Sequence, residues 1–266
     1  MPSASQTRRR ELARLKARRE AARRRARRRR ALLVYGSLGV VVLVAGVAGV
    51  MVRDHQKAKP AAQSGQDARV DVPTAPATVA CGGKVPPRVI HPKLDRLPKT
   101  KANPSQHYQV VLKTSCGDVT VQLDPKAAPA TTYNFVFLAQ RHFYDSTWFH
   151  RIVPGGKNNI GVIQGGDPKG TGEGGPGYNI PDELPKGKNP YKKYTMAMAN
   201  SGPNSGGSQF FISTQDNKLQ STFTLFGKVV KGQDVIDRIA QTPLGGPRGD
   251  TPTESVWIES ATVSIT

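Results

Sequence analysis

The segment from Ala31 to Val52 constrains this chain more than any other, because its 22 consecutive residues carry no charge. A helix of that length rises about 33 Å, enough to cross the hydrocarbon core of a bilayer. The alternatives are a buried core helix, which is usually shorter, and a cleaved signal peptide, whose apolar region normally spans about 7–15 residues. The longer run and its exit through Met51-Val52-Arg53 favour an uncleaved transmembrane anchor.

Charge is distributed unevenly around this segment. The formal net charge is +20, and residues 1–30 hold 14 Lys/Arg and 2 Asp/Glu, whereas residues 105–266 hold 15 and 13. The positive-inside rule therefore predicts a cell-membrane protein with a cytoplasmic N-terminus and an extracytoplasmic C-terminal domain. The arginine-rich head also suits an anionic lipid surface. Nucleic acid is a disfavoured partner, because the head has no aromatic side chain to stack on bases.

The composition after the apolar run is that of a linker. Residues 53–80 are rich in Ala, Pro, Gln and Asp, and residues 81–104 contain repeated prolines, which predict an extended strap. The predicted organisation is a basic cytoplasmic head (1–30), a transmembrane helix (31–52), a linker with a Pro-rich strap (53–104) and a folded domain (105–266).

The folded domain has the pattern of a β protein. Val119, Val121 and Leu123 alternate with polar residues after a turn, which predicts a hairpin with the apolar run Tyr108–Thr114. Further strands are expected at 194–199, 209–213, 224–230 and 256–265, and helices at 130–141 and 234–240. Short strands, glycine turns and two helices predict a mainly β fold, a closed antiparallel barrel with helical covers.

Two patterns that often mark cofactor sites are discounted. Gly170 to Gly175 matches G-x-G-x-x-G, but Pro176-Gly177 follows where a dinucleotide site needs a helix, so a loop is expected. The five His and two Cys show no metal-ligand spacing. We expect neither a metal nor another cofactor.

Three segments carry the chemistry. They are Phe149-His150-Arg151-Ile152-Val153-Pro154-Gly155 with Gln164-Gly165-Gly166-Asp167, then Met198 to Asn204 running into Gly207-Ser208-Gln209-Phe210-Phe211-Ile212, and finally Phe223 to Val229. In this order they resemble the cyclophilin family over residues 108–266. The resemblance implies an eight-stranded antiparallel barrel capped by two helices, with peptidyl-prolyl cis-trans isomerase activity on Pro-containing polypeptides. We expect the protein to be a monomer.

The resemblance also assigns roles to residues. Arg151 would be the catalytic residue, Gln164 would position a substrate carbonyl, and Gln209 would orient Arg151 or the substrate. His150, beside Arg151, is expected to be structural. The remaining assignments are substrate-binding residues: Val162, Ala199, Asn200, Ser201, Phe211, Leu219 and Phe223.

Several departures from the family pattern affect the pocket. Eight residues, 156–163, lie between Gly155 and Gln164 where typical members have three. Phe223 replaces a common histidine, Lys218 a common tryptophan and Ser201 a common alanine. These differences leave open a second function, a module that holds Pro-containing peptides with little turnover. A third is an adaptor whose arginine head binds nucleic acid or lipid.

The two cysteines of the chain, Cys81 and Cys116, are each followed by glycine and are expected in turns. An extracytoplasmic location permits oxidation, and the even count leaves no odd thiol. These features predict a disulfide that fixes the strap to the first hairpin. The alternative is a pair of unbonded, small apolar side chains.

Overall fold

The computed structural model describes residues 75–94, 96–157, 160–187 and 190–266. The expected basic head, the transmembrane helix and most of the linker lie outside these ranges, so they stay predictions. Within the described ranges, no helix has the length and apolar character that crossing a membrane requires.

The first hairpin forms where period-two alternation is strongest. Strands β1 (Tyr108–Thr114) and β2 (Gly117–Leu123) pair antiparallel, and Val110 lies opposite Val121. Burial alternates along both strands: Val110 and Leu112 of β1 and Val119, Val121 and Leu123 of β2 are buried, and the residues between them are more exposed. Alternate side chains of a strand point to opposite faces, so the pattern sets one apolar face toward the core.

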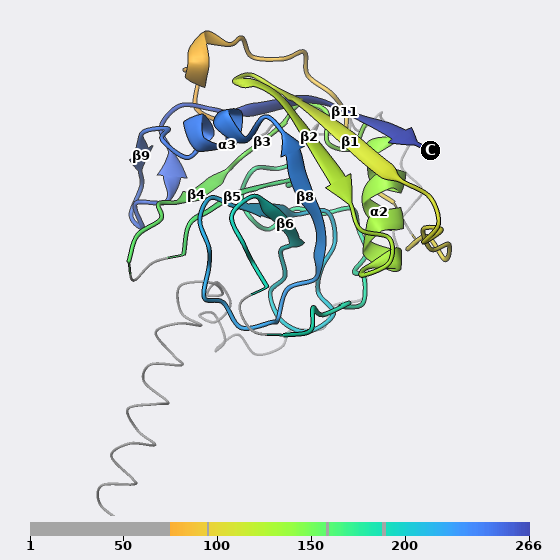
Figure 1. The fold of residues 1–266 in the computed structure, drawn as a ribbon. Helices are drawn as coiled ribbons and strands as arrows, with labels where there is room; N and C mark the ends of the chain where they lie inside the picture. The colour runs from red at the N-terminus through yellow and green to blue at the C-terminus, as the bar shows by residue number, and fades with distance from the viewer. Residues whose placement is uncertain (1–74, 95, 158–159, 188–189) are drawn as a thin grey trace, which may run out of the picture. The chain divides into compact units, whose positions relative to one another are not determined.

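Nine strands form one antiparallel sheet in the order β3-β11-β1-β2-β8-β6-β7-β5-β4 (Figure 1). The other strands of this sheet are β3 (Thr147–Trp148), β4 (Arg151–Val153), β5 (Val162–Gly165), β6 (Thr195–Met198), β7 (Phe210–Ser213), β8 (Leu225–Lys231) and β11 (Trp257–Ile265). Two short strands, β9 (Leu244–Gly245) and β10 (Thr251–Pro252), form a separate antiparallel ribbon.

The expectation of a closed eight-stranded barrel is wrong. The sheet of the described chain curls into a half-barrel, and its end strands β3 and β4 do not pair with each other. Only Phe149 and His150 separate these strands, so the strands follow one another along one segment and cannot lie side by side. The Phe149 N–H donates to the Val256 carbonyl, which ties this segment to the C-terminal part of the chain.

Two α-helices flank the sheet, as predicted. Helix α2 (Pro129–Ala139) lies at one end of the β1–β2 hairpin and α3 (Gln233–Ile239) at the other (Figure 1). Proline suits the first turn of α2 because the backbone N–H that it lacks would have no partner in the helix. The Glu183 carboxylate accepts the next two backbone N–H groups, from Ala130 and Thr131, at 3.0 and 2.8 Å.

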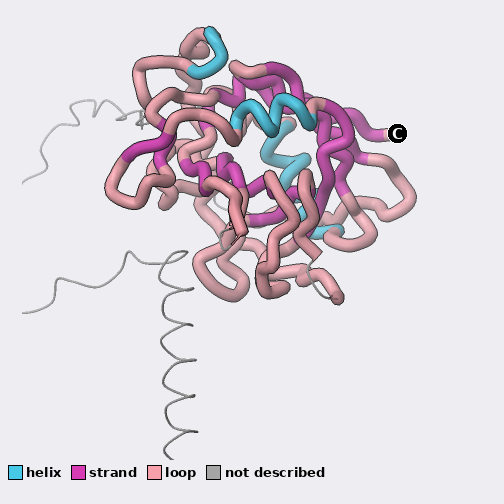
Figure 2. The backbone as a smooth tube through the Cα atoms, turned by 60° about the vertical axis from the view of Figure 1, so that its left-hand side comes forward, coloured by secondary structure: helices cyan, strands magenta, loops and turns pink. Residues whose placement is uncertain are grey.

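Phe135 of α2 is the centre of an aromatic core. Its ring centroid lies 4.6 Å from that of Tyr144, 5.5 Å from Phe210 and 5.4 Å from Phe226. All four side chains are fully buried. Edge-to-face and offset contacts of this kind add about 0.5–1.5 kcal/mol per pair beyond area burial, so α2 is held firmly against the sheet. Much of the remaining chain is loop, drawn pink in Figure 2.

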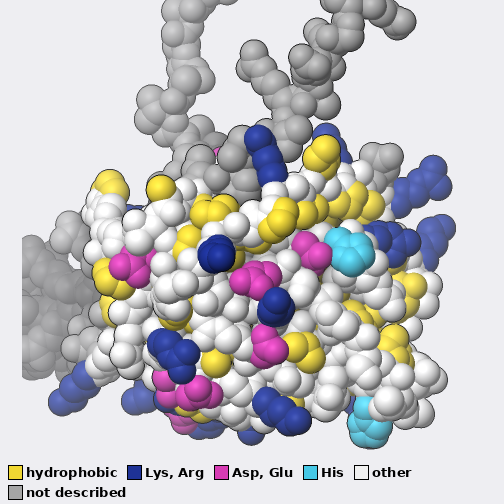
Figure 3. Space-filling view, turned by 90° about the horizontal axis from the view of Figure 1, so that it is seen from above, with side chains coloured by type: hydrophobic (Ala, Val, Ile, Leu, Met, Phe, Trp, Pro, Cys, Tyr) yellow, Lys and Arg dark blue, Asp and Glu magenta, His cyan; other side chains and the backbone are white. Residues whose placement is uncertain are grey.

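The Pro-rich strap is bound to the domain at several points. The Ser146 hydroxyl donates to the Pro87 carbonyl at 2.7 Å, and the Leu94 N–H donates to the Pro176 carbonyl at 2.8 Å. Val85 and Ile90 remain exposed. Figure 3 shows the face that lies uppermost in Figure 1, where apolar side chains gather among scattered lysines and arginines.

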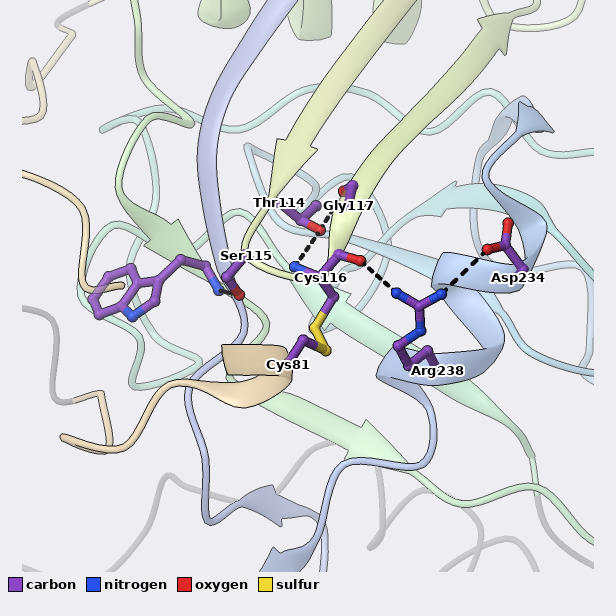
Figure 4. Close-up of a disulfide and its surroundings, with 8 residues drawn as sticks. Cys81, Thr114, Ser115, Cys116, Gly117, Asp234 and Arg238 are labelled. Carbon is purple, nitrogen blue, oxygen red and sulfur yellow. Dashed lines mark hydrogen bonds and ion pairs between the residues drawn. A yellow bond between two sulfur atoms is a disulfide. The ribbon is translucent and has the colours of Figure 1, made fainter. Parts of the chain in front are cut away.

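A disulfide joins Cys81 to Cys116, with their Cα atoms 5.1 Å apart (Figure 4). Cys81 lies in the 3₁₀ turn η1 (Ala80–Gly82), and Cys116 lies in the turn between β1 and β2. The Arg238 guanidinium of α3 donates to the Cys116 carbonyl at 3.0 Å. The start of the strap, the first hairpin and the second helix therefore meet at one point.

Candidate active site

Arg151, Gln164 and Phe211 lie side by side on three neighbouring strands. In the antiparallel ladders, Arg151 of β4 is opposite Gln164 of β5, which is in turn opposite Phe211 of β7. Directly opposed residues project from the same face of a sheet. The sheet register therefore places a guanidinium, an amide and an apolar ring in one row.

A chain of hydrogen bonds links Arg151 through Gln164 and Gln209 to a glycine-rich loop. The Arg151 Nη1 donates to the Gln164 Oε1 at 3.4 Å, and the Gln164 Nε2 donates to the Gln209 Oε1 at 3.0 Å. The Gln209 Nε2 then donates to the carbonyls of Gly172 and Gly174, both at 2.9 Å. Because carbonyls only accept, they fix which end of the Gln209 amide is nitrogen, and this fixes the orientation of Gln164.

The glycine-rich segment that matched G-x-G-x-x-G is the loop that receives Gln209. The buried Asp167 carboxylate accepts backbone N–H groups from Lys169, Gly172 and Gly174 at 2.8, 2.6 and 3.1 Å. A side chain at Gly174 would collide with this carboxylate. The predicted loop is confirmed, and it shapes one end of the site.

Asp250 holds the other side of Arg151, and sequence reasoning missed it. The Arg151 Nε lies 2.8 Å from the Asp250 Oδ2, and the two side chains are 15% and 10% exposed. No motif in the sequence marked this residue, which lies 99 positions away from its partner. The guanidinium thus bonds Asp250 through its Nε and Gln164 through its Nη1.

An apolar cluster adjoins the row of site residues. The rings of Phe211 and Phe223 meet edge to face at 5.3 Å, and Tyr191 lies 6.2 and 6.1 Å from them. The Tyr191 hydroxyl donates to the Phe223 carbonyl and accepts from the Phe223 N–H, and burial raises its pKa. Tyr191 was not predicted, because no motif surrounds it. Val162 of β5 is buried two residues from Gln164.

The other residues assigned to substrate binding are placed as follows. The Ala199 N–H donates to the Gln209 carbonyl at 2.9 Å. The Asn200 amide donates to the carbonyl of Thr222, the neighbour of Phe223, at 2.8 Å. Ser201 is exposed, and Leu219 is half-buried on the loop between β7 and β8. Ala199 and Asn200 are therefore tied to the site residues by hydrogen bonds.

Two side-chain amides hold the insertion at 156–163. The Gln215 amide bonds both backbone groups of Gly156, accepting its N–H at 2.9 Å and donating to its carbonyl at 3.3 Å. The Asn217 amide does the same to Gly161, at 2.8 and 2.9 Å. The insertion is thus fixed at both ends to the loop that follows β7, beside the strands that carry Arg151 and Gln164.

His150, the residue before Arg151, is buried. It is 7% exposed, and neither ring nitrogen has a hydrogen-bond partner among the described residues. Burial lowers its pKa, while the nearby Asp167 carboxylate opposes that shift. The neutral imidazole is the form that this environment favours.

Fold and site together define a class of protein: a mainly β domain whose curled antiparallel sheet presents an oriented arginine beside an apolar cluster. Within the described residues, no group of three or more His, Cys, Asp or Glu side chains could hold a metal ion.

Comparison with known proteins identifies the family. Residues 109–263 match the family described as cyclophilin type peptidyl-prolyl cis-trans isomerase/CLD. This chain therefore belongs to the cyclophilin-type peptidyl-prolyl cis-trans isomerases, and it is an isomerase of that family.

Similar proteins agree with this assignment. The chain is 41% identical over 177 residues to peptidyl-prolyl cis-trans isomerase B of Streptomyces anulatus, which covers 60% of this chain and 98% of that protein. It is 41% identical over 171 residues to peptidyl-prolyl cis-trans isomerase A of Mycobacterium tuberculosis, covering 58% and 90%. A crystal structure of a Cryptosporidium parvum cyclophilin, obtained in the presence of the dipeptide Ala-Pro, superposes with a TM-score of 0.53 at 30% identity, covering 59% of this chain and 98% of that one.

Proposed function

We propose that Arg151 is the catalytic residue for rotation about X-Pro bonds in polypeptide substrates. The barrier to rotation is about 18–20 kcal/mol, because the amide is conjugated. In the twisted transition state the lone pair of the prolyl nitrogen is localised on that nitrogen, which can then accept a hydrogen bond. A guanidinium suits this task because it is always charged and carries several donors in a fixed plane.

The observation that carries this proposal is the way Arg151 is held. Its Nε is bonded to Asp250 and its Nη1 to Gln164, and Gln164 lies directly opposite Phe211. A donor that is oriented before the substrate binds does not need to reorganise in the transition state. The Phe211–Phe223 cluster supplies apolar surface suited to a proline ring. The structure solved with Ala-Pro supports a proline-containing substrate.

We further propose that the domain acts on exported proteins outside the cytoplasmic membrane, anchored by residues 31–52. Support comes from the uncharged 22-residue run, the 14 basic residues that precede it and the disulfide. Disulfides persist mainly in oxidising compartments. In this proposal the basic head contacts anionic lipid on the cytoplasmic side.

A second candidate is a module that binds Pro-containing peptides with little turnover. It is favoured by the insertion at 156–163, which is fixed next to the site by Gln215 and Asn217. Protease-coupled isomerisation of a Pro-containing peptide separates the two. We expect turnover by the wild type and a loss of about 2–4 kcal/mol of transition-state stabilisation in Arg151→Ala, by analogy with the loss of an oxyanion-hole donor. Peptide binding without turnover by the wild type would favour the binding module.

A further inference from the structure

We propose that Asp250 is a positioning residue for the isomerisation, acting through Arg151. The inference rests on the proposed catalytic role of Arg151. Asp250 immediately precedes β10, whose ribbon with β9 lies beside β4 (Figure 1). A short element outside the main sheet thus places a carboxylate against the side chain whose orientation the reaction requires.

Two separate contacts fix Asp250 to the strand that carries Arg151. Its backbone carbonyl accepts the N–H of Ile152, the next residue of β4, at 2.9 Å. Its Oδ2 accepts from the Arg151 Nε at 2.8 Å. The backbone contact sets where the carboxylate lies, and the side-chain contact sets the direction of the guanidinium.

The same carboxylate meets a second arginine in a different environment. The Asp250 Oδ1 lies 3.3 Å from the Arg248 Nε, and the Arg248 side chain is 67% exposed, against 15% for Arg151. Water screens an exposed pair, which contributes little, whereas a charge-assisted bond between buried partners is short and directional. We therefore assign the positioning effect to the Arg151 contact alone.

The geometry indicates why Arg151 needs this partner. A free arginine side chain samples many rotamers, and ordering it costs conformational entropy. The 2.8 Å contact to Asp250 is shorter than the 3.4 Å contact to Gln164, so of these two bonds Asp250 gives the tighter restraint. With its Nε bonded to Asp250, the planar guanidinium directs its Nη1 toward Gln164.

The test is kcat/KM for a Pro-containing peptide, measured on the full chain in detergent and corrected for the folded fraction. Asp250→Asn keeps the shape of the side chain and removes its charge, whereas Asp250→Ala removes the side-chain contacts to Arg151 and Arg248 and keeps the backbone contact to Ile152. We expect kcat/KM to fall about ten- to hundredfold, the scale on which a displacement of about 1 Å acts. Two controls, Arg248→Ala and Asp234→Asn (an ion pair with Arg238 in α3), should stay within about twofold of the wild type.

A double-mutant cycle separates positioning from a general structural effect. If Asp250 acts through Arg151, Asp250→Ala costs several-fold less in the Arg151→Ala background than in the wild type. An equal loss in both backgrounds would show that Asp250 acts elsewhere. Should Asp250→Ala fail to fold, the same cycle is run with Asp250→Asn.

A spectroscopic readout adds a second criterion. The Arg151 Nε–H resonance, assigned by its absence in Arg151→Ala, should shift in Asp250→Asn and remain in place in Arg248→Ala. Unchanged activity or an unshifted resonance in Asp250→Asn would refute the positioning role. If Arg151→Ala itself kept wild-type turnover, the proposed mechanism would fail first, and the two failures are thereby distinguished.

Discussion

Arg151 and Gln164 lie directly opposite each other in the pairing of β4 with β5, and the guanidinium Nη1 donates to the Gln164 Oε1. The same guanidinium bonds Asp250 through its Nε, so its planar group bridges two partners. Lysine has one point-like ammonium and no such plane. We therefore predict that Arg151→Lys lowers kcat/KM by about tenfold or more, measured by protease-coupled isomerisation. Arg248→Lys is the matched control, and equal losses in both variants would contradict the prediction.

Lys218 bears on inhibitor binding. In the resembling family a tryptophan supplies an indole N–H and apolar surface near the groove, and in this chain the matching residue is an exposed lysine. We predict weak binding of cyclosporin-type ligands, and tighter binding by Lys218→Trp, with Kd measured by calorimetry. Lys186→Trp, an exposed lysine elsewhere, is the control. An unchanged Kd in Lys218→Trp would mean that this position does not contact the ligand.

His150 predicts a pH dependence of stability. Burial holds its folded-state pKa below the ordinary value of 6.5, so as pH falls below about 6.5 the unfolded chain takes up a proton that the folded chain resists. The free energy of unfolding should therefore decrease as pH falls from about 6.5 toward 5. His91, whose pKa burial also lowers, contributes in the same direction.

Denaturant melts at several pH values check this contribution. His150→Phe should flatten the decrease between pH 6.5 and 5, and His91→Phe should flatten it in part. A slope that is identical in the wild type and in His150→Phe would show that the imidazole titrates alike in both states.

The disulfide predicts a measurable loss of stability on its removal. The bond spans 35 residues, and closing a loop of that size constrains the unfolded chain by roughly 3–4 kcal/mol in the loop-entropy model. We expect Cys81→Ala/Cys116→Ala to lower the free energy of unfolding by about that amount. Non-reduced mass spectrometry of protein isolated from its native source should show one cross-linked peptide pair. Two freely alkylated cysteines there would contradict the assignment.

The topology prediction rests on the charge asymmetry around residues 31–52. A reporter that is active only in the cytoplasm, fused after Thr266, should give no signal, and an extracytoplasmic reporter should give a strong one. The control is the same pair of fusions placed before residue 31, where the signals should be reversed. A strong cytoplasmic signal at Thr266 would exclude the proposed role in the folding of exported proteins.

The parts of the fold that local patterns determine were predictable. The apolar run Tyr108–Thr114 predicted the observed bounds of β1, and both helices were expected within two residues of their observed ends. The strands β3, β9 and β10 have only two residues each, so no local pattern marks them. The closed barrel was wrong for the same reason: closure depends on where the segment around Phe149 runs, and no local pattern encodes that.

The site also contains residues that the sequence could indicate and residues that it could not. The family motifs indicated Arg151, Gln164, Gln209 and Phe211, and the structure brings these residues together. Asp250 and Tyr191 could not be found, because each acts through a contact across 99 or 32 residues that no short pattern records. A charged residue after a glycine turn, such as Gly249-Asp250, is too common to be a signal by itself.

The position of the disulfide determines how mechanical tension would enter the domain. A pull on the chain before Cys81 would pass through the sulfur–sulfur bond to Cys116 and on into the turn between β1 and β2. The intervening residues 82–115, which include the strap and β1, would lie off the path of the force. The hydrogen bonds that join Ser255 to Thr78 and Ala80 would share the load. Tension applied to the chain before Cys81 would therefore neither detach the strap from the domain nor separate β1 from the sheet.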